Sequence, residues 1–200
     1  MDLRRRTLLA GAATLAAAPV FARASAAQPT VTMTTGQGVI VLELAADKAP
    51  LTSANFLRYV AARRFDGSSF YRAVRTGDAG AGLIEGGLQN DPAKLFAPIA
   101  HESTTQTGLA HVDGTISMAR YGPGTATADF FICSGPAPYL DANPAATGDN
   151  LGYAAFGQVT EGMDVVRAIL ALPTNGVARN PVMKGQILSP PAPILSVRRA

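Results

Sequence analysis

The chain has little of several residue types on which common functions depend. Among its 200 residues there is no tryptophan, one cysteine (Cys133) and two histidines, His101 and His111. A single cysteine excludes an internal disulfide, and its place in the apolar run FFIC favours a buried thiol over a nucleophile. The two histidines lack helical i, i+4 spacing, and with Glu102 and Asp113 they match no closed metal site. We therefore expect neither a metal nor an organic cofactor.

Charged residues make up only 16% of the chain, and the basic excess lies at its beginning. Residues 1–26 hold four arginines and one aspartate of the 17 basic and 14 acidic residues, so 13 of each remain in residues 27–200. This balance gives no support to binding of nucleic acid or of a membrane by residues 27–200. No long apolar heptad is present either, and we expect a monomer.

The first 26 residues have the composition of an export signal. A basic start precedes an apolar run from Leu8 to about Phe21 and a closing ASA. The run is shorter than the roughly 20 residues that span a bilayer, which favours a cleaved signal over an anchor. The pair Arg5 and Arg6 resembles the twin-arginine type, and an ordinary secretory signal is the alternative. We expect residues 27–200 to form one domain, exported to the periplasm of a bacterium.

Apolar periodicity indicates many short strands and two helices. The segment 30–44 alternates on both sides of Gly36-Gln37-Gly38, as in a β-hairpin. Helical spacing occurs in 50–64, where Thr52 or Ser53 is available as a cap, and in 161–172. Further strands are expected at 69–74, 82–88, 114–120, 128–133 and 153–159, with two more, QIL and PILSV, in the tail, and surface loops at 104–107 and 139–150. This pattern favours a mainly β fold, a closed or nearly closed antiparallel barrel.

One predicted strand carries a charge in an unfavourable place. In SFYRAV the two-residue period puts Phe70, Arg72 and Val74 on one face, with a guanidinium between two apolar side chains. In ADFFIC the same period points Phe130 and Phe131 to opposite faces, so one of them needs an apolar site outside the core. Packing against a helix or loop is the ordinary explanation, and a ligand pocket is the alternative.

Two other kinds of site find weaker support. The stretch GDAGAGLIEGG does not complete G-x-G-x-x-G, because Glu85 stands at the last glycine position, and this disfavours a phosphate cradle. Glu85 and Asp129 are a candidate carboxylate pair for hydrolysis if the fold brings them face to face.

Three motifs together carry a resemblance to a known family. FYRAV followed by IEGGL, then GTISMARYGPGTATADFFIC, then YAAFGQVTEGMDVV, resemble the signature segments of the cyclophilin-type peptidyl-prolyl cis-trans isomerases, within a match from about Thr30 to Val197. The resemblance implies a closed eight-stranded antiparallel β-barrel capped by two α-helices, with a substrate groove on its outer wall. It also implies an enzyme that accelerates X-Pro isomerisation in proline-containing polypeptides, here exported ones, and so assists their folding.

The resemblance assigns roles position by position. Arg72 corresponds to the arginine used in catalysis, and Phe131 corresponds to the aromatic floor of the proline pocket. Ala119 corresponds to a backbone site that grips the peptide, and Leu83 and Ile84 to the pocket wall. The glycine pair that follows Glu85 is expected to keep the backbone close to the peptide.

Several substrate-binding positions depart from the common pattern. Glu85 and Asp129 stand where glutamine is usual, Arg120 where asparagine is usual, and Tyr71 and Tyr153 where histidine is usual. Because the arginine and the apolar floor remain, we expect isomerisation with an altered preference. A carboxylate near the arginine either orients the guanidinium or holds it away from substrate. In the second case the protein is a catalytically weak proline-peptide-binding module or chaperone with the same fold.

Overall fold

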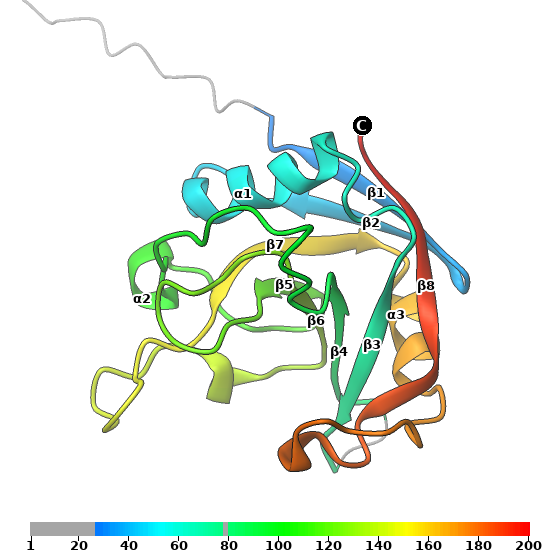
Figure 1. The fold of residues 1–200 in the computed structure, drawn as a ribbon. Coiled ribbons are helices and arrows are strands. Elements are labelled where there is room, and N and C mark those ends of the chain that lie inside the picture. Colours follow the sequence, from blue (N-terminus) through cyan, green and yellow to red (C-terminus); the bar gives the residue numbers. More distant parts are fainter. Residues whose placement is uncertain (1–26, 78–79) are drawn as a thin grey trace, which may run out of the picture.

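The computed structural model describes residues 27–77 and 80–200, and its strands close into a barrel (Figure 1). The predicted export signal, residues 1–26, lies outside the described residues. The barrel is closed in the order β1-β2-β7-β5-β6-β4-β3-β8, and all its neighbouring strands pair antiparallel. The strands are β1 (Thr30–Thr35), β2 (Gly38–Leu44), β3 (Ser68–Arg75), β4 (Gly82–Gly87), β5 (Thr115–Met118), β6 (Phe130–Ser134), β7 (Ala154–Glu161) and β8 (Ile187–Arg199). The predicted eight-stranded barrel is confirmed.

Two helices pack against the barrel, as predicted. Helix α1 (Pro50–Ala61) packs against β7 and β8, and helix α3 (Met163–Leu170) packs against β2, β3, β4 and β6. Within 27–77 and 80–200, no helix combines the length and apolar character needed to cross a membrane.

A third helix, α2 (Thr104–Thr107), is a single turn where the sequence predicted a loop. The backbone N–H of Ser103 donates to the side-chain oxygen of Gln106 at 3.0 Å, and Gly108 ends the turn with a φ of 68°. Such reciprocal capping stabilises a turn that has no apolar periodicity to reveal it. A short 3-10 turn, η1 (Pro138–Leu140), begins the loop that was predicted for 139–150.

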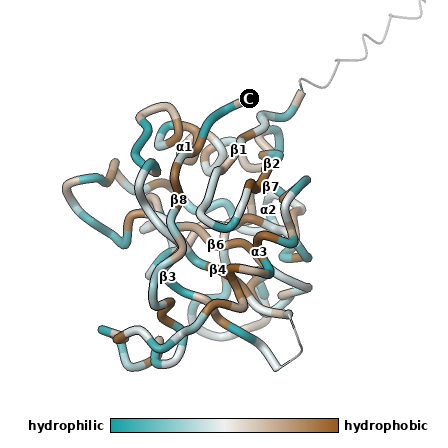
Figure 2. The backbone as a smooth tube through the Cα atoms, turned by 90° about the vertical axis from the view of Figure 1, so that its right-hand side faces the viewer, coloured by the Kyte–Doolittle hydropathy of each residue, from teal (hydrophilic) through white to brown (hydrophobic). Residues whose placement is uncertain are grey.

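Aromatic side chains fill the barrel interior. Phe56 of α1 lies with its ring centroid 5.2 Å from Phe65, 5.4 Å from Phe156 and 5.5 Å from Phe130, so the helix places an aromatic ring among the strands. Figure 2 shows hydrophobic positions on parts of the strands and helices, and both hydrophilic and hydrophobic positions along the loops. Burial of this cluster is the main favourable contribution to folding.

The expectation that Phe70 and Arg72 share a face of β3 is wrong. Phe70 pairs with Gly86 while Arg72 pairs with Glu85, so two steps along β3 match one step along β4, and the register shifts between them. A β-bulge of this kind changes the direction of the following side chains. Phe70 therefore packs in the barrel core, whereas Arg72 and Val74 lie on the outer wall.

The tail forms one strand where two were predicted. β8 runs unbroken through Pro190, Pro191 and Pro193 and pairs with both β1 and β3. Pro190 and Pro191 fall in the register shift between Ile187 and Ala192, where β8 has no residue paired with β3, so their missing N–H groups cost few ladder hydrogen bonds. The carbonyl of Pro193 instead accepts a hydrogen bond from the N–H of Gly36 in the β1–β2 turn, at 2.9 Å.

Helix α1 is capped from a distant loop. Its N-cap residue, Ala49, makes no side-chain cap, and neither Thr52 nor Ser53 caps the helix as predicted. Instead the carboxylate of Glu102 accepts from the N–H of Leu51 at 3.1 Å and from the N–H of Thr52 at 2.8 Å. A negative charge at this end also interacts favourably with the helix dipole.

We expect Glu102→Ala to lower the free energy of unfolding by about 1 to 2 kcal/mol, because two helix N–H groups lose their acceptor. Urea denaturation followed by circular dichroism measures this change. Glu161→Ala, at an exposed strand position, is the matched control and should stay within about 0.5 kcal/mol of the wild type. Equal effects of the two substitutions would contradict a capping role for Glu102.

Candidate active site

A cavity of about 790 Å³ lies on the outer wall of the barrel, across β6, β4, β3 and the beginning of β8. It brings together eight of the nine predicted catalytic and substrate-binding residues: Arg72, Leu83, Glu85, Ala119, Arg120, Asp129, Phe131 and Tyr153. The strand order places the floor residues in sequence, from Phe131 on β6, through Leu83 on β4 and Arg72 on β3, to Ile187 on β8.

Ile84 does not belong to this cavity, and the expectation that it forms a pocket wall is wrong. Neighbouring residues of a strand point to opposite faces, so Leu83 faces the groove while Ile84 is fully buried in the barrel core.

Gly86 and Gly87 allow close packing within the protein itself, because neither position has room for a side chain. A Cβ at Gly86 would lie 2.8 Å from a ring carbon of Phe70, and one at Gly87 would overlap the Asp129 carboxylate.

An apolar pocket forms around Phe131, outside the main core. Phe131, Leu83 and Leu140 are buried together, and Tyr153 packs against them. The Tyr153 ring meets the Phe131 ring edge-on, with centroids 5.4 Å apart. Cys133 lies in the same cluster as a buried thiol whose pKa burial raises to about 12, so it stays protonated and unreactive, as expected from the sequence.

A histidine beneath Phe131 was not predicted as part of this site. The His111 ring stacks on Phe131 at 5.9 Å between centroids and is buried. Its Nδ1 donates to Asp141 at 2.6 Å, and its Nε2 accepts from the Ser117 hydroxyl at 2.9 Å. Burial lowers the pKa of His111 and outweighs the opposite effect of Asp141, so the ring is neutral near pH 7. Among the described residues, no group of three potential ligands is placed to hold a metal ion.

Arg72 is held by two partners, one on the neighbouring strand β4 and one immediately before β8. Its Nη1 donates to Glu85 at 2.7 Å, and its Nε donates to the side-chain oxygen of Gln186 at 2.8 Å. The second oxygen of Glu85 accepts from the Tyr71 hydroxyl at 2.8 Å. Burial, assisted by the Glu85 carboxylate, raises the pKa of Tyr71 far above its ordinary value, so this hydroxyl remains a donor.

The two contacts fix the plane of the Arg72 guanidinium. Within the described part of the chain Nη2 has no hydrogen-bond partner, and the side chain, 20% exposed, borders the cavity. A charge-assisted pair and an amide contact limit its rotation. Glu85 and Gln186 therefore orient the guanidinium while leaving one terminal nitrogen for a ligand.

Asp129 supports a turn at the cavity wall. Its carboxylate accepts from the N–H of Gln89 at 2.8 Å and from the N–H of Asn90 at 3.0 Å, two residues with positive φ. Burial raises the pKa of Asp129 to about 6, although these amides lower it. Each oxygen of Glu85 and Asp129 is occupied by a protein donor, so the arrangement does not favour the carboxylate pair for hydrolysis.

Arg120 and Ala119 both border the groove. Arg120 fixes a neighbouring loop, and Ala119 contributes a backbone group. The Arg120 guanidinium donates to both oxygens of Asp149, at 2.5 and 3.0 Å, and to the carbonyl of Gly152, and it lies over the Tyr153 ring. It therefore holds the loop before β7 against the pocket. The N–H of Ala119 donates to the carbonyl of Asp129 at 2.9 Å. The backbone group of Ala119 that can bind a peptide is therefore its carbonyl, as a hydrogen-bond acceptor.

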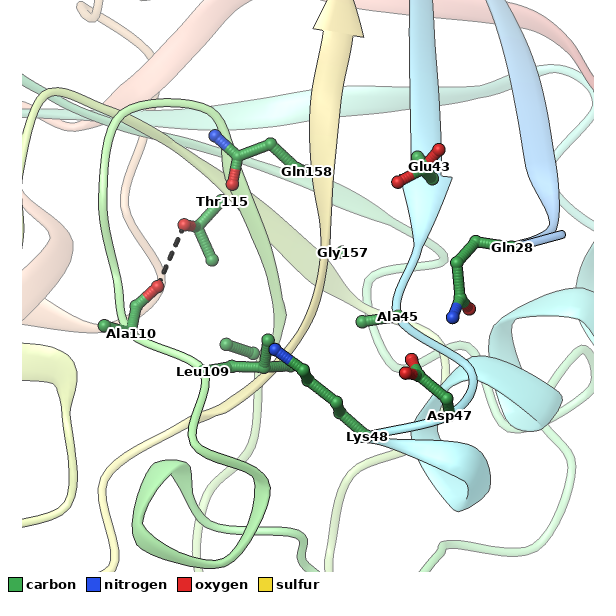
Figure 3. A pocket seen from close by; sticks show the side chains of 11 residues that line it. Gln28, Glu43, Ala45, Asp47, Lys48, Leu109, Ala110, Thr115, Gly157 and Gln158 are labelled. Carbon is green, nitrogen blue, oxygen red and sulfur yellow. Dashed lines mark hydrogen bonds between the residues drawn. The ribbon is translucent and has the colours of Figure 1, made fainter. Parts of the chain in front are cut away.

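A second, smaller cavity of about 250 Å³ lies elsewhere on the barrel (Figure 3). Glu43, Asp47 and Lys48 border it beside Leu109, and the hydroxyl of Thr115 donates to a neighbouring carbonyl. None of the predicted site residues lines this cavity.

The chain is similar to several known proteins. Residues 30–190 match the family model described as cyclophilin type peptidyl-prolyl cis-trans isomerase/CLD. The chain is similar to the peptidyl-prolyl cis-trans isomerase cyp18 of Streptomyces antibioticus, with 39% identity over 72% of this chain and 85% of that protein. It is also similar to a peptidyl-prolyl cis-trans isomerase of Acinetobacter baylyi, with 34% identity over 84% of each. A crystal structure of a Cryptosporidium parvum cyclophilin type peptidyl-prolyl cis-trans isomerase, solved in the presence of the dipeptide Ala-Pro, shares the fold, with a TM-score of 0.67 at 20% identity over 86% of this chain and 98% of that one.

The raised pKa of Asp129 predicts a pH-dependent stability. Its pKa is about 6 in the folded protein and ordinarily 3.8, so between these pH values the folded state binds more protons than the unfolded state. The contribution of Asp129 to the free energy of unfolding therefore falls as pH rises through this window, by on the order of 1 to 3 kcal/mol.

Urea denaturation between pH 4 and pH 8 tests this, with Asp129→Asn as the variant that cannot titrate. The stability difference between wild type and variant should change between about pH 4 and 6 and be constant above. Gln37→Ala, at an exposed turn position without a titratable group, is the control, and its stability difference from the wild type should not depend on pH. A difference that is independent of pH would contradict the prediction for Asp129.

Proposed function

Because the chain belongs to the cyclophilin-type peptidyl-prolyl cis-trans isomerases and is an enzyme of that class, we propose that it isomerises X-Pro bonds in exported proteins with Arg72 as its catalytic residue. The observation that carries the proposal is the oriented guanidinium of Arg72, held by Glu85 and Gln186 beside the apolar pocket floored by Phe131.

The reaction requires rotation about a bond with partial double-bond character. Resonance opposes this rotation with a barrier of roughly 18 to 20 kcal/mol. Uncatalysed X-Pro exchange therefore takes tens to hundreds of seconds, which is slow enough to limit folding. The reaction breaks no covalent bond, so it needs neither a nucleophile nor a metal ion.

The pocket around Phe131 supplies the binding part of the reaction. Phe131, Leu83 and Leu140 present apolar carbon to the cavity, and Val74 and Tyr153 adjoin them. A proline ring buried there loses contact with water, which favours binding. Held in this way, the ring is fixed while the part of the chain before proline rotates.

Arg72 supplies the part that acts on the transition state. When the peptide bond twists, the proline nitrogen becomes pyramidal and its lone pair can accept a hydrogen bond. A guanidinium N–H placed beside the pocket makes this bond strongly only in the twisted state, which raises the rate and not just the affinity. Because Glu85 and Gln186 already fix the guanidinium plane, little reorganisation is needed during the reaction.

The alternative is a catalytically weak proline-peptide-binding module or chaperone. It would follow if the Glu85 carboxylate held Arg72 too strongly for the guanidinium to reach substrate. The contact between Nη1 and Glu85 leaves Nη2 without a partner among the described residues, on a side chain that borders the cavity, and this supports the enzyme.

We expect Arg72→Ala to lower kcat/KM for X-Pro isomerisation by about 100-fold or more, as for loss of a donor that acts in the transition state. Arg72→Lys should lose activity as well, because it keeps the charge and lacks the planar fork. Exchange NMR on a short X-Pro peptide measures the rate directly, with peptide binding followed in the same spectra and the peptide mass checked for cleavage. Wild-type protein that binds the peptide without isomerising it would contradict the proposal and favour the binding module.

Substitutions of Glu85 show, in the same assay, whether this carboxylate orients the Arg72 guanidinium or holds it away from the substrate. Glutamine keeps an acceptor for Arg72, and the Tyr71 hydroxyl is able to accept from its amide, so kcat/KM should stay within about threefold. Glu85→Ala removes the acceptor and should lower kcat/KM by about tenfold. A large rise in activity in either variant would mean that Glu85 restrains the arginine.

Export is proposed from the composition of residues 1–26, and the twin-arginine route from Arg5 and Arg6. We expect the full chain, expressed in a bacterium, to accumulate in the periplasmic fraction with a new N-terminus near Ala27, as sequencing of the purified protein would show. Arg5→Lys combined with Arg6→Lys should block export by the twin-arginine route, whereas Arg23→Lys, the control, should not. Full-length protein confined to the cytoplasm would contradict export.

A further inference from the structure

The most exposed large apolar side chains of the described residues gather around one cavity. Val177 is 91% exposed, Tyr121 83%, Val182 77% and Tyr139 62%, and all four border the groove described above. Exposed apolar residues are common when scattered, but a cluster at the rim of a cavity indicates a binding surface.

Two of them, Val177 and Val182, belong to the segment that connects α3 to β8, residues 171–186, which we call the connecting segment. It passes beside the ends of β3 and β8, in orange at the bottom of Figure 1. The strand order β6-β4-β3-β8 puts Phe131 on one side of Arg72 and the connecting segment on the other. A peptide whose proline occupies the Phe131 pocket and which continues past Arg72 therefore reaches this segment.

The connecting segment is fixed to the barrel and does not hang free. Arg75 of β3 donates to the carbonyls of Leu170 and Leu172 and to the Thr174 hydroxyl, at 2.9, 2.5 and 3.2 Å. At the other end, Gln186 accepts from Arg72. A surface that is already ordered loses little conformational entropy when it binds a ligand.

The charges in the groove favour a ligand of one sign. Arg72 is paired with Glu85, Arg120 with Asp149, and the Asp129 carboxylate with backbone amides. Arg179 lies on the connecting segment, is exposed, borders the cavity, and has no ion pair or hydrogen bond within residues 27–77 and 80–200. It is the groove cation available to a carboxylate of the substrate.

We propose that the connecting segment is a specificity-determining wall of the active site, in which Val177, Val182 and Arg179 select an extended unfolded polypeptide that carries an apolar and an acidic residue near its X-Pro bond. This inference rests on the proposed function and names the substrate class of the same groove. The apolar residue packs against the two valines, and the acidic residue pairs with Arg179. Arg72 and the Phe131 pocket act on the proline whatever the neighbouring sequence is.

Three peptides test the wall, and the two extended ones have the same length. The first is a short X-Pro peptide, and the second is extended on both sides by leucine and glutamate. The third carries serine and lysine at the same positions. For the wild type we expect kcat/KM to be about tenfold higher for the leucine and glutamate peptide than for the serine and lysine peptide. Exchange NMR measures all three rates.

The triple variant Val177→Ser, Val182→Ser, Arg179→Glu should reduce this preference to about twofold or less and leave the short peptide within twofold of wild type. The matched control is Val39→Ser with Leu195→Ser, two apolar residues that are 46% and 56% exposed and lie outside the cavity. The control should keep the full preference.

Three results would overturn the proposal: no preference in the wild type, a preference that survives in the triple variant, or an equal loss of activity on the short peptide. Failure of the proposed function is distinguishable, because the wild type would then not isomerise the short peptide. In that case calorimetric Kd values for the two extended peptides still test the wall, and equal values in the wild type would overturn it.

Discussion

The bulge between Phe70 and Arg72 is the constraint on which the groove depends. An unbroken two-residue period would direct both side chains to one face, and either an arginine would enter the aromatic core or a phenylalanine would leave it. The register shift against β4 sends Phe70 inward and Arg72 outward within two residues. The same shift brings Arg72 opposite Glu85, and the closing of the barrel by β8 brings it next to Gln186. One local irregularity thus places a charge on the outer wall together with the partners that fix its direction.

Charges in and around the groove are compensated before any substrate arrives. An isolated buried charge is costly, and pairing or hydrogen bonding removes much of that cost. Glu85 has Arg72 and Tyr71, Asp129 has two backbone amides, and His111 stays neutral between Asp141 and Ser117. The Phe131 pocket can therefore remain apolar although polar and charged side chains lie around it. Within residues 27–77 and 80–200, Nη2 of Arg72 and the guanidinium of Arg179 have no partner, and both side chains border the cavity.

Local patterns in the sequence predicted the elements, and the family motifs predicted most of the site. The β1–β2 hairpin around Gln37, the helix that begins at Pro50 and the Phe130–Phe131 pair follow from short-range rules of turn chemistry and alternation. What the sequence could not predict are contacts between residues far apart in the chain. Gln186 lies 114 positions from Arg72, and Glu102 accepts from the N–H of Thr52, which lies 50 positions earlier in the chain. The prediction for Ile84 failed for a different reason: a motif assigned two adjacent residues to one wall, whereas a strand alternates them.

The alternation on β4 and β6 has a consequence for how such a protein can change over time. Leu83 and Phe131 face the groove, while their neighbours Ile84 and Phe130 face the core. The residues that face the substrate and the residues that form the core therefore lie on opposite faces of the same strands. A substitution on the outer face can change the groove without disturbing the barrel core. The five departures at Tyr71, Glu85, Arg120, Asp129 and Tyr153 all border the cavity. A protein of this fold can therefore change its substrate preference by single substitutions on the outer face, with little effect on the stability of the barrel.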